Sequence, residues 1–291
     1  MRLIDICQLS TPRVTGCWEL GDVLLDPGPT SGLERLLAGV SGRPKALLLT
    51  HIHLDHAGAT GSLVERWPDL EVYVHELGAP HLVDPSRLLA SARRLYGDDM
   101  DRLWGEMVPV PEANLRIVKG GEQVIDGRFE VAYTPGHASH HVSYLHKPTP
   151  IFGVRVAFVG DVGGVRIGEG SLTIAPTPPP DIDLEAWHGS IERIRAWRPD
   201  RLAIAHFGSY DDVEHQLDEV GWRLEEWAQR ARDQDRAVFI DGIRDEVAGG
   251  AEANLLDAYA LAAPPEQVYA GLERYWRKRA EAVPPGSPRV S

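Results

Sequence analysis

The sequence predicts an α/β protein, and three observations support that fold class. Short apolar runs, such as 46–49 and 156–159, are bounded by Pro, Gly or Asp and have the length of buried strands. Segments with helical spacing, such as 33–40 and 184–197, lie between such runs. The 291 residues are 43% hydrophobic and 25% charged, an ordinary globular composition with enough chain for one large core or two domains.

Charge and composition narrow the classes of function. The net charge of −13 argues against a general nucleic-acid or membrane-surface binder, so we expect a small-molecule substrate and neither nucleic acid nor membrane as a partner. Neither a signal peptide nor a membrane-spanning apolar run is recognisable, and a cytoplasmic location is the expectation. Cys7 and Cys17 are expected to be buried thiols, because cytosolic proteins seldom keep disulfides.

The first half of the chain alternates strands and helices. We expect strands at 3–9, 14–20, 22–25, 46–49 and 71–75, and helices at 33–40 and 57–67. Between 85 and 107, apolar residues recur every three or four positions, which indicates helices with one apolar face, divided at Gly97. Packing against the core is the expected use of most of that face.

The second half repeats the pattern and then becomes helical. We expect strands at 115–118, 123–125, 129–134, 142–146, 156–159 and 202–205. Asp183 can cap a helix at 184–197, and the Gly- and Pro-rich segment before it is expected to shape a pocket. Helices are expected at 211–232, 240–247, 254–261 and 265–280, with a frayed end at 284–291.

Four metal-competent side chains follow the central predicted strand. His51, His53, Asp55 and His56 come within six positions of each other, directly after the run 46–49. Imidazole nitrogens and carboxylate oxygens suit Zn²⁺ and similar divalent ions. Polar groups at the end of a buried strand also lie where α/β proteins usually bind ligands.

The stretch THIHLDHAG resembles the HxHxDH signature of the metallo-β-lactamase-fold hydrolase superfamily. Three later motifs match the remaining ligands of that family: TPGH ending at His137, FVGD ending at Asp161 and AIAH ending at His206. The resemblance implies a four-layer αββα sandwich over residues 1–232, with a helical insertion at about 85–107. A helical extension, 233–291, would follow and cover a sheet edge or form a homodimer contact.

The resemblance also implies a dinuclear metal site in which every ligand atom is a nitrogen or an oxygen. His51, His53 and His137 match the ligands of the first ion. Asp55, His56 and His206 match those of the second, and Asp161 matches the carboxylate that bridges both. Zn²⁺ is the expected metal, with Fe or Mn as alternatives. Two such ions hold a hydroxide between them. The resemblance implies that Asp55 orients this hydroxide or shuttles its proton, and Asp55 and Asp161 are the expected catalytic carboxylates.

Other residues have two interpretations each. The resemblance makes Asp26 a partner for a ligand histidine, while its position before Pro-Gly equally suits a turn cap. Tyr210 would bind substrate or protonate a leaving group, or else be structural. The insertion would place Tyr96, Trp104, Arg93 and Arg94 near the substrate, or these side chains would only pack against the sandwich. His75 and His81 lie outside the ligand pattern, and His140 stands where the family often has Gly.

The motif spacing is most similar to the glyoxalase-II-like and lactonase-like branch, which implies hydrolysis of an ester, thioester or lactone. Phosphodiesterase or β-lactamase activity would use the same two ions. A second alternative is a persulfide-dioxygenase-like enzyme with one iron on His51, His137 and Asp161. A non-catalytic metal-binding protein is disfavoured, because all seven ligands are present. The residues after Asp161 are Val and Gly, where the lactonases carry Tyr.

Overall fold

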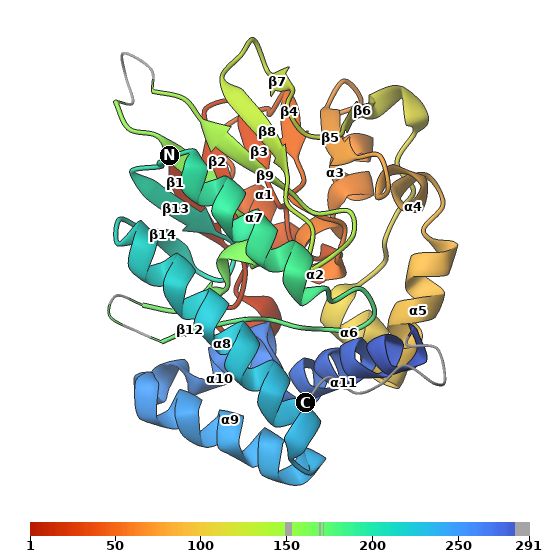
Figure 1. The fold of residues 1–291 in the computed structure, drawn as a ribbon. Coiled ribbons are helices and arrows are strands. Elements are labelled where there is room, and N and C mark those ends of the chain that lie inside the picture. Colours follow the sequence, from red (N-terminus) through yellow and green to blue (C-terminus); the bar gives the residue numbers. More distant parts are fainter. Residues whose placement is uncertain (149–152, 169, 171, 283–291) are drawn as a thin grey trace.

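A computed structural model of the protein describes residues 1–148, 153–168, 170 and 172–282. Two six-stranded sheets pack against each other, and helices cover both outer faces (Figure 1). The first sheet has the order β1-β2-β3-β4-β5-β6 and the second the order β14-β13-β10-β9-β8-β7. The four-layer αββα sandwich predicted from the motifs is confirmed.

The first sheet begins with antiparallel strands and continues with parallel ones. Its strands are β1 (Arg2–Asp5), β2 (Gly16–Leu20), β3 (Val23–Leu25), β4 (Ala46–Leu48), β5 (Glu71–His75) and β6 (Leu115–Val118). The helices in this half are α1 (Leu33–Gly39), α2 (Leu54–Ala57), α3 (Thr60–Arg66), α4 (Ala79–Val83), α5 (Ser86–Tyr96) and α6 (Met100–Trp104). The insertion is thus two helices, and they separate at Gly97 as expected.

The second sheet pairs antiparallel except between β10 and β13. Its strands are β7 (Gln123–Val124), β8 (Phe129–Tyr133), β9 (Val142–His146), β10 (Val156–Phe158), β13 (Arg201–Ile204) and β14 (Gly208–Tyr210), with β11 (Val165–Arg166) and β12 (Thr173–Ile174) forming a separate ribbon. The helix α7 (Leu184–Ala196) lies over this sheet (Figure 1). The Asp183 carboxylate accepts the Ala186 N–H at 2.9 Å, which confirms the predicted cap.

Alternating side chains divide the core into three apolar layers. On β3, Val23 and Leu25 point into the layer between the sheets, whereas Leu24 points to the helices on the other side. The middle layer also contains Phe129 and Phe158 from the second sheet, whose ring centroids are 6.3 Å apart. Each sheet is therefore buried on both faces, as its continuous apolar runs require.

The C-terminal helices pack on the second half of the sandwich and reach the insertion (Figure 1). They are α8 (Val213–Asp233), α9 (Arg236–Gly250), α10 (Leu256–Ala262) and α11 (Pro265–Ala282), and α9 is longer than the predicted 240–247. The frayed end expected at 284–291 lies outside the described residues. Within the residues that the structure describes, every helix is too short or too polar to cross a membrane.

The predicted strand at 3–9 is wrong beyond Asp5. The Asp5 carboxylate accepts the backbone N–H groups of Cys7 and Arg13, at 2.8 and 2.9 Å, and turns the chain. Cys7 and Leu9 then adopt left-handed backbone angles that no strand contains. Cys7 and Cys17 are free thiols; Cys17 is buried, as expected, whereas Cys7 is only half-buried.

Candidate metal centre

The HxHxDH stretch is a short connection whose ends are fixed by the sheet and by a helix. β4 ends at Leu48, and α2 begins at Leu54, so His51 and His53 lie on the loop between them. α2 then carries Asp55 and His56 on its first turn. The loop is anchored beneath by Asp26, whose carboxylate accepts the Thr50 N–H at 2.8 Å and the Thr50 hydroxyl at 2.7 Å.

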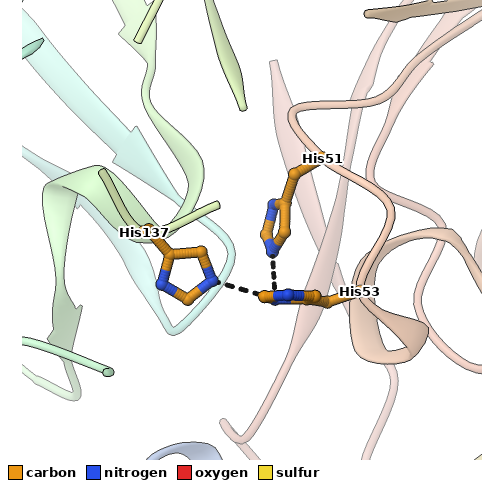
Figure 2. Close-up of side chains that lie close together, drawn as sticks. All are labelled: His51, His53 and His137. Atoms are coloured by element: carbon orange, nitrogen blue, oxygen red, sulfur yellow. Dashed lines mark hydrogen bonds between the residues drawn. The ribbon is translucent and has the colours of Figure 1, made fainter. Parts of the chain in front are cut away.

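Three imidazoles form the first of two groups of candidate metal ligands (Figure 2). His53 Nδ1 lies 3.0 Å from His51 Nε2 and 2.9 Å from His137 Nε2. His137 comes from the other half of the chain, after β8, so two sheets contribute to the group. These three side chains can place one nitrogen each around a single metal ion.

A second group lies beside the first, and one carboxylate reaches both. Asp55, His56 and His206 form the second group, with 3.2 Å between the Nε2 atoms of the two histidines. Asp161 Oδ1 is 3.1 Å from His56 Nε2, and its Oδ2 is 3.3 Å from His137 Nε2. The structure thus brings all seven predicted side chains together, and Asp161 occupies the position between the two groups.

Two motif glycines are required by close contacts. Gly160, just before Asp161, has φ +46°, and a Cβ there would lie 2.6 Å from the Thr50 hydroxyl. Gly136, just before His137, has φ +133°, and its Cβ would lie 2.3 Å from the Trp187 backbone. A larger residue at either position would displace the adjacent side chain of the site.

The outward nitrogens of three histidines are held by acceptors. His137 Nδ1 donates to the Pro176 carbonyl at 2.9 Å, and His206 Nδ1 donates to the Val14 carbonyl at 2.5 Å. His56 Nδ1 donates to Asp26 at 3.0 Å. Because Nδ1 carries the proton in each neutral ring, the lone pair is on Nε2 and points into the cluster.

Burial and neighbouring charges set the protonation of the site. Burial and the adjacent imidazoles lower the pKa of His51 well below its ordinary value and that of His53 to about 4. Burial would also lower the pKa of His56, but the Asp161 and Asp55 carboxylates outweigh it and raise the pKa. For Asp55, burial is outweighed by His56 and His206, and the pKa falls to about 2. His51 and His53 are therefore neutral, whereas the Asp161 and Asp55 carboxylates favour a positive charge at His56.

This arrangement fits a divalent metal pair. Asp161 Oδ1 is buried and makes no hydrogen bond, although a buried carboxylate oxygen normally has a partner. The Nε2 lone pairs of His56 and His206 face each other, which is repulsive unless a cation or proton lies between them. Cations bound to the two groups would satisfy the carboxylate and the lone pairs together.

For Tyr210 and for two arginines of the insertion, the structure favours the structural interpretation over a role at the site. The Tyr210 hydroxyl donates to the Arg166 and Phe207 carbonyls, at 2.7 and 2.5 Å, and so it holds a turn. A cavity opens beside the seven candidate metal ligands, and Tyr210 does not line it. Arg93 and Arg94 are exposed and do not line that cavity either, whereas Arg87 does. The helical register explains the difference, because the residues of α5 that face the cavity are three or four apart and Arg93 and Arg94 fall between them.

Other histidines lie around the cluster. His75 is buried outside it and stacks on Tyr133, with ring centroids 4.5 Å apart. His81 and His140 line the cavity, and His140 Nδ1 accepts the Ile52 N–H at 3.4 Å. No sequence pattern indicates this bond or the carbonyl partners of His137 and His206, because they depend on backbone atoms far away in the chain.

The sequence of the chain is similar to a known protein family over most of its sandwich. The model of the metallo-beta-lactamase superfamily matches residues 19–206. The metallo-beta-lactamase fold-containing protein ST1585 of Sulfurisphaera tokodaii is 28% identical over 212 residues, which cover 70% of this chain and 75% of that protein.

Solved structures share the fold. The crystal structure of ST1585, an archaeal member of the superfamily, gives a TM-score of 0.61 at 23% identity and covers 75% of this chain and 84% of its own. The crystal structure of TTHA1623 in a di-iron-bound form gives a TM-score of 0.51 at 27% identity and covers 72% of this chain and 94% of its own. TTHA1429 from Thermus thermophilus gives 0.59 at 18% identity and covers 91% of this chain and 88% of its own. The family match spans more than half of the sequence, and the chain belongs to the metallo-β-lactamase superfamily.

Proposed function

We propose that the protein is a metal-dependent hydrolase that binds two divalent ions and cleaves an ester, thioester or lactone. The observation that carries the proposal is the position of Asp161, with one carboxylate oxygen directed at each of two adjoining ligand groups. His51, His53 and His137 would hold one ion, and Asp55, His56 and His206 the other. Zn²⁺ suits this set of nitrogen and oxygen ligands.

Iron and manganese are alternatives for the same residues. TTHA1623, 27% identical over 72% of this chain, was solved with two irons, and this supports iron as a candidate here. When bound, a divalent ion pair lowers the pKa of water to about 7 and polarises a carbonyl oxygen. The choice of metal therefore changes rate and redox behaviour, while the ligand set stays the same.

The protein's own groups would position the reactants. Asp55 lies at the cavity wall and can accept a hydrogen bond from an attacking water. His140 also lines the cavity; because its Nδ1 accepts the Ile52 N–H, its proton is on Nε2, where it can donate to a substrate oxygen. The water oxygen adds to the carbonyl carbon, the C–O or C–S bond breaks, and the alcohol or thiol leaves with a proton.

A single-iron, persulfide-dioxygenase-like site is less well supported. It would use His51, His137 and Asp161 alone. The facing nitrogens of His56 and His206, 3.2 Å apart, would then have no cation between them. Phosphodiester and β-lactam hydrolysis remain candidates on the two-ion site and belong in the substrate panel.

The test combines metal content with turnover. Protein purified with Zn²⁺, Fe²⁺ or Mn²⁺ would be assayed on thioester, lactone, β-lactam and bis-p-nitrophenyl phosphate substrates. We expect about two ions per chain and the highest kcat/KM on a carboxylic ester, thioester or lactone. Asp161→Ala should lose at least one ion and nearly all turnover, while the surface variant Asp200→Ala serves as its control. Full activity of Asp161→Ala would refute the proposal.

A further inference from the structure

A cavity of about 520 Å³ opens from the candidate metal centre, and its far walls come from outside the ligand motifs. His53, Asp55 and Asp161 line one end. Most of the other lining residues belong to the insertion helices, to the segment 176–181, and to the end of α10 and the start of α11. The volume is in the range of cavities that enclose small organic ligands, about 300–1,000 Å³.

The insertion supplies an apolar wall. Leu88, Ala92 and Leu95 follow one another at intervals of four and three on α5, so they share one helix face, and all three line the cavity. Tyr96 and Trp104 continue this wall, with ring centroids 5.0 Å apart. Leu95 is 44% exposed and lines the cavity, so its apolar surface is accessible to a ligand.

The C-terminal helices supply a second wall, which is hydrogen-bonded to the first. Leu261 and Val268 line the cavity from α10 and α11, and Pro176 lines it from the segment that follows Asp161. The Tyr96 hydroxyl donates to Gln267 Oε1 at 3.2 Å, which joins α5 to α11. This hydrogen bond links the two walls of the cavity directly.

The charges on the cavity walls disfavour polyanionic ligands. Among the described residues that line the cavity, Arg87 alone has an arginine or lysine side chain, and it is exposed. Away from the metal centre, a polyanionic group would have Arg87 as its one arginine or lysine partner among these lining residues and would face the Asp181 carboxylate. An apolar group would instead bury its surface against Leu88, Leu95 and Trp104.

We propose that this cavity binds an apolar acyl group longer than a few carbons, carried by the substrate whose carbonyl is cleaved at the metal centre. The inference rests on the proposed hydrolase function of the same site. Its specific content is that the insertion and the C-terminal helices select the acyl side of the substrate by hydrophobic contact. A short acyl group would leave these walls without a partner.

Binding of uncleavable amides tests the inference independently of turnover. The zinc-loaded protein would be titrated with the N-methyl amides of acetic, hexanoic and octanoic acid, and Kd measured by ligand-detected NMR. A methylene that is fully buried strengthens binding about fourfold, so the hexanoic amide should bind at least ~10-fold more tightly than the acetic amide. Equal affinity for the three amides would overturn the inference.

Leu95→Asp tests the wall itself. Leu95 is already exposed, so the fold should be kept, and circular dichroism and zinc content verify this. We expect its Kd for the octanoic amide to rise at least ~5-fold, while the matched control Val238→Asp, on the exposed face of α9, leaves it unchanged. An unchanged Kd in Leu95→Asp would also overturn the inference.

The binding assay separates this inference from the proposed function. Chain-length-dependent binding without turnover of any ester, thioester or lactone would refute the hydrolase and support the apolar cavity. Turnover that is equally efficient for acetyl, hexanoyl and octanoyl p-nitrophenyl esters, together with equal amide affinities, would support the hydrolase and overturn the cavity inference.

Discussion

Replacing Asp26 by Asn would remove one negative charge from beneath His56 without disturbing the backbone. Asp26 has φ +49°, in the left-handed region that Asn tolerates well and Ala does not. The side chains have nearly the same shape, so Asp26→Asn isolates the carboxylate. This substitution therefore tests whether Asp26 orients a ligand histidine or only caps its turn.

The expected magnitude follows from three hydrogen bonds. The Asp26 carboxylate accepts from the Thr50 N–H, the Thr50 hydroxyl and His56 Nδ1, at 2.8, 2.7 and 3.0 Å. An Asn oxygen can keep the bond to the Thr50 N–H, and the hydroxyl can reverse its role. The Asn NH₂ would face the His56 N–H, however, and leave a buried donor unpaired at a cost of about 1–3 kcal/mol. If His56 changed tautomer to avoid this, its Nε2 would lose the lone pair needed for a metal.

Metal affinity is the decisive assay. Loss of the carboxylate partner of a ligand imidazole typically costs about 10–100-fold in affinity. We expect a loss of this size in Asp26→Asn for the more weakly held ion, measured by competition with a chromophoric chelator. Asp22→Asn, a half-exposed carboxylate near the same strand, is the control. If Asp26→Asn bound both ions within about threefold of the unmodified protein, the orienting role would be refuted.

Three further changes test separate parts of the account. Burial would raise the pKa of Glu19 above its ordinary value of 4.5, but hydrogen bonds from Ser41 and its other partners outweigh burial and lower it. The stabilisation is thus present above pH 4.5 and fades as pH falls through the folded-state pKa. Glu19→Gln should lower the free energy of unfolding in urea by about 1–2 kcal/mol at pH 7 and by less at pH 3.5, and an equal loss at both pH values would contradict this. His75→Ala should unfold about 1 kcal/mol more easily yet keep its full metal content by elemental analysis; loss of metal would show that the ligand set is misassigned. His140→Ala, which removes the acceptor of the Ile52 N–H, should keep both ions and lower kcat/KM about 10-fold, and unchanged steady-state kinetics would exclude the donor role.

Local motifs account for the part of the site that could be predicted from sequence. HxHxDH fixes four side chains on one short connection, and the glycines before His137 and Asp161 reflect contacts that any larger residue would break. The continuous apolar run at 46–49 likewise predicted a buried strand, and its residues contact the core on both faces of the sheet. These features depend on neighbours in the chain or on backbone conformation, and so they are visible in a single sequence.

Long-range partners could not be predicted. The carbonyl that accepts the His137 N–H belongs to Pro176, 39 residues away, and every residue offers the same backbone atom whatever its side chain. Periodicity showed that the helix α5 has an apolar face but not that this face lines one cavity together with α11. Tyr210 was a plausible site residue by its position after His206, yet its hydroxyl is used by two backbone carbonyls.

The number of metal ions that the seven side chains hold tests the two-ion hydrolase proposal directly. Elemental analysis of the protein after saturation with Zn²⁺ and removal of free metal should give two ions per chain, and Asp161→Ala should give one or none. A single iron per chain, with O₂ uptake in the presence of glutathione persulfide and no second metal bound at saturation, would contradict the two-ion hydrolase.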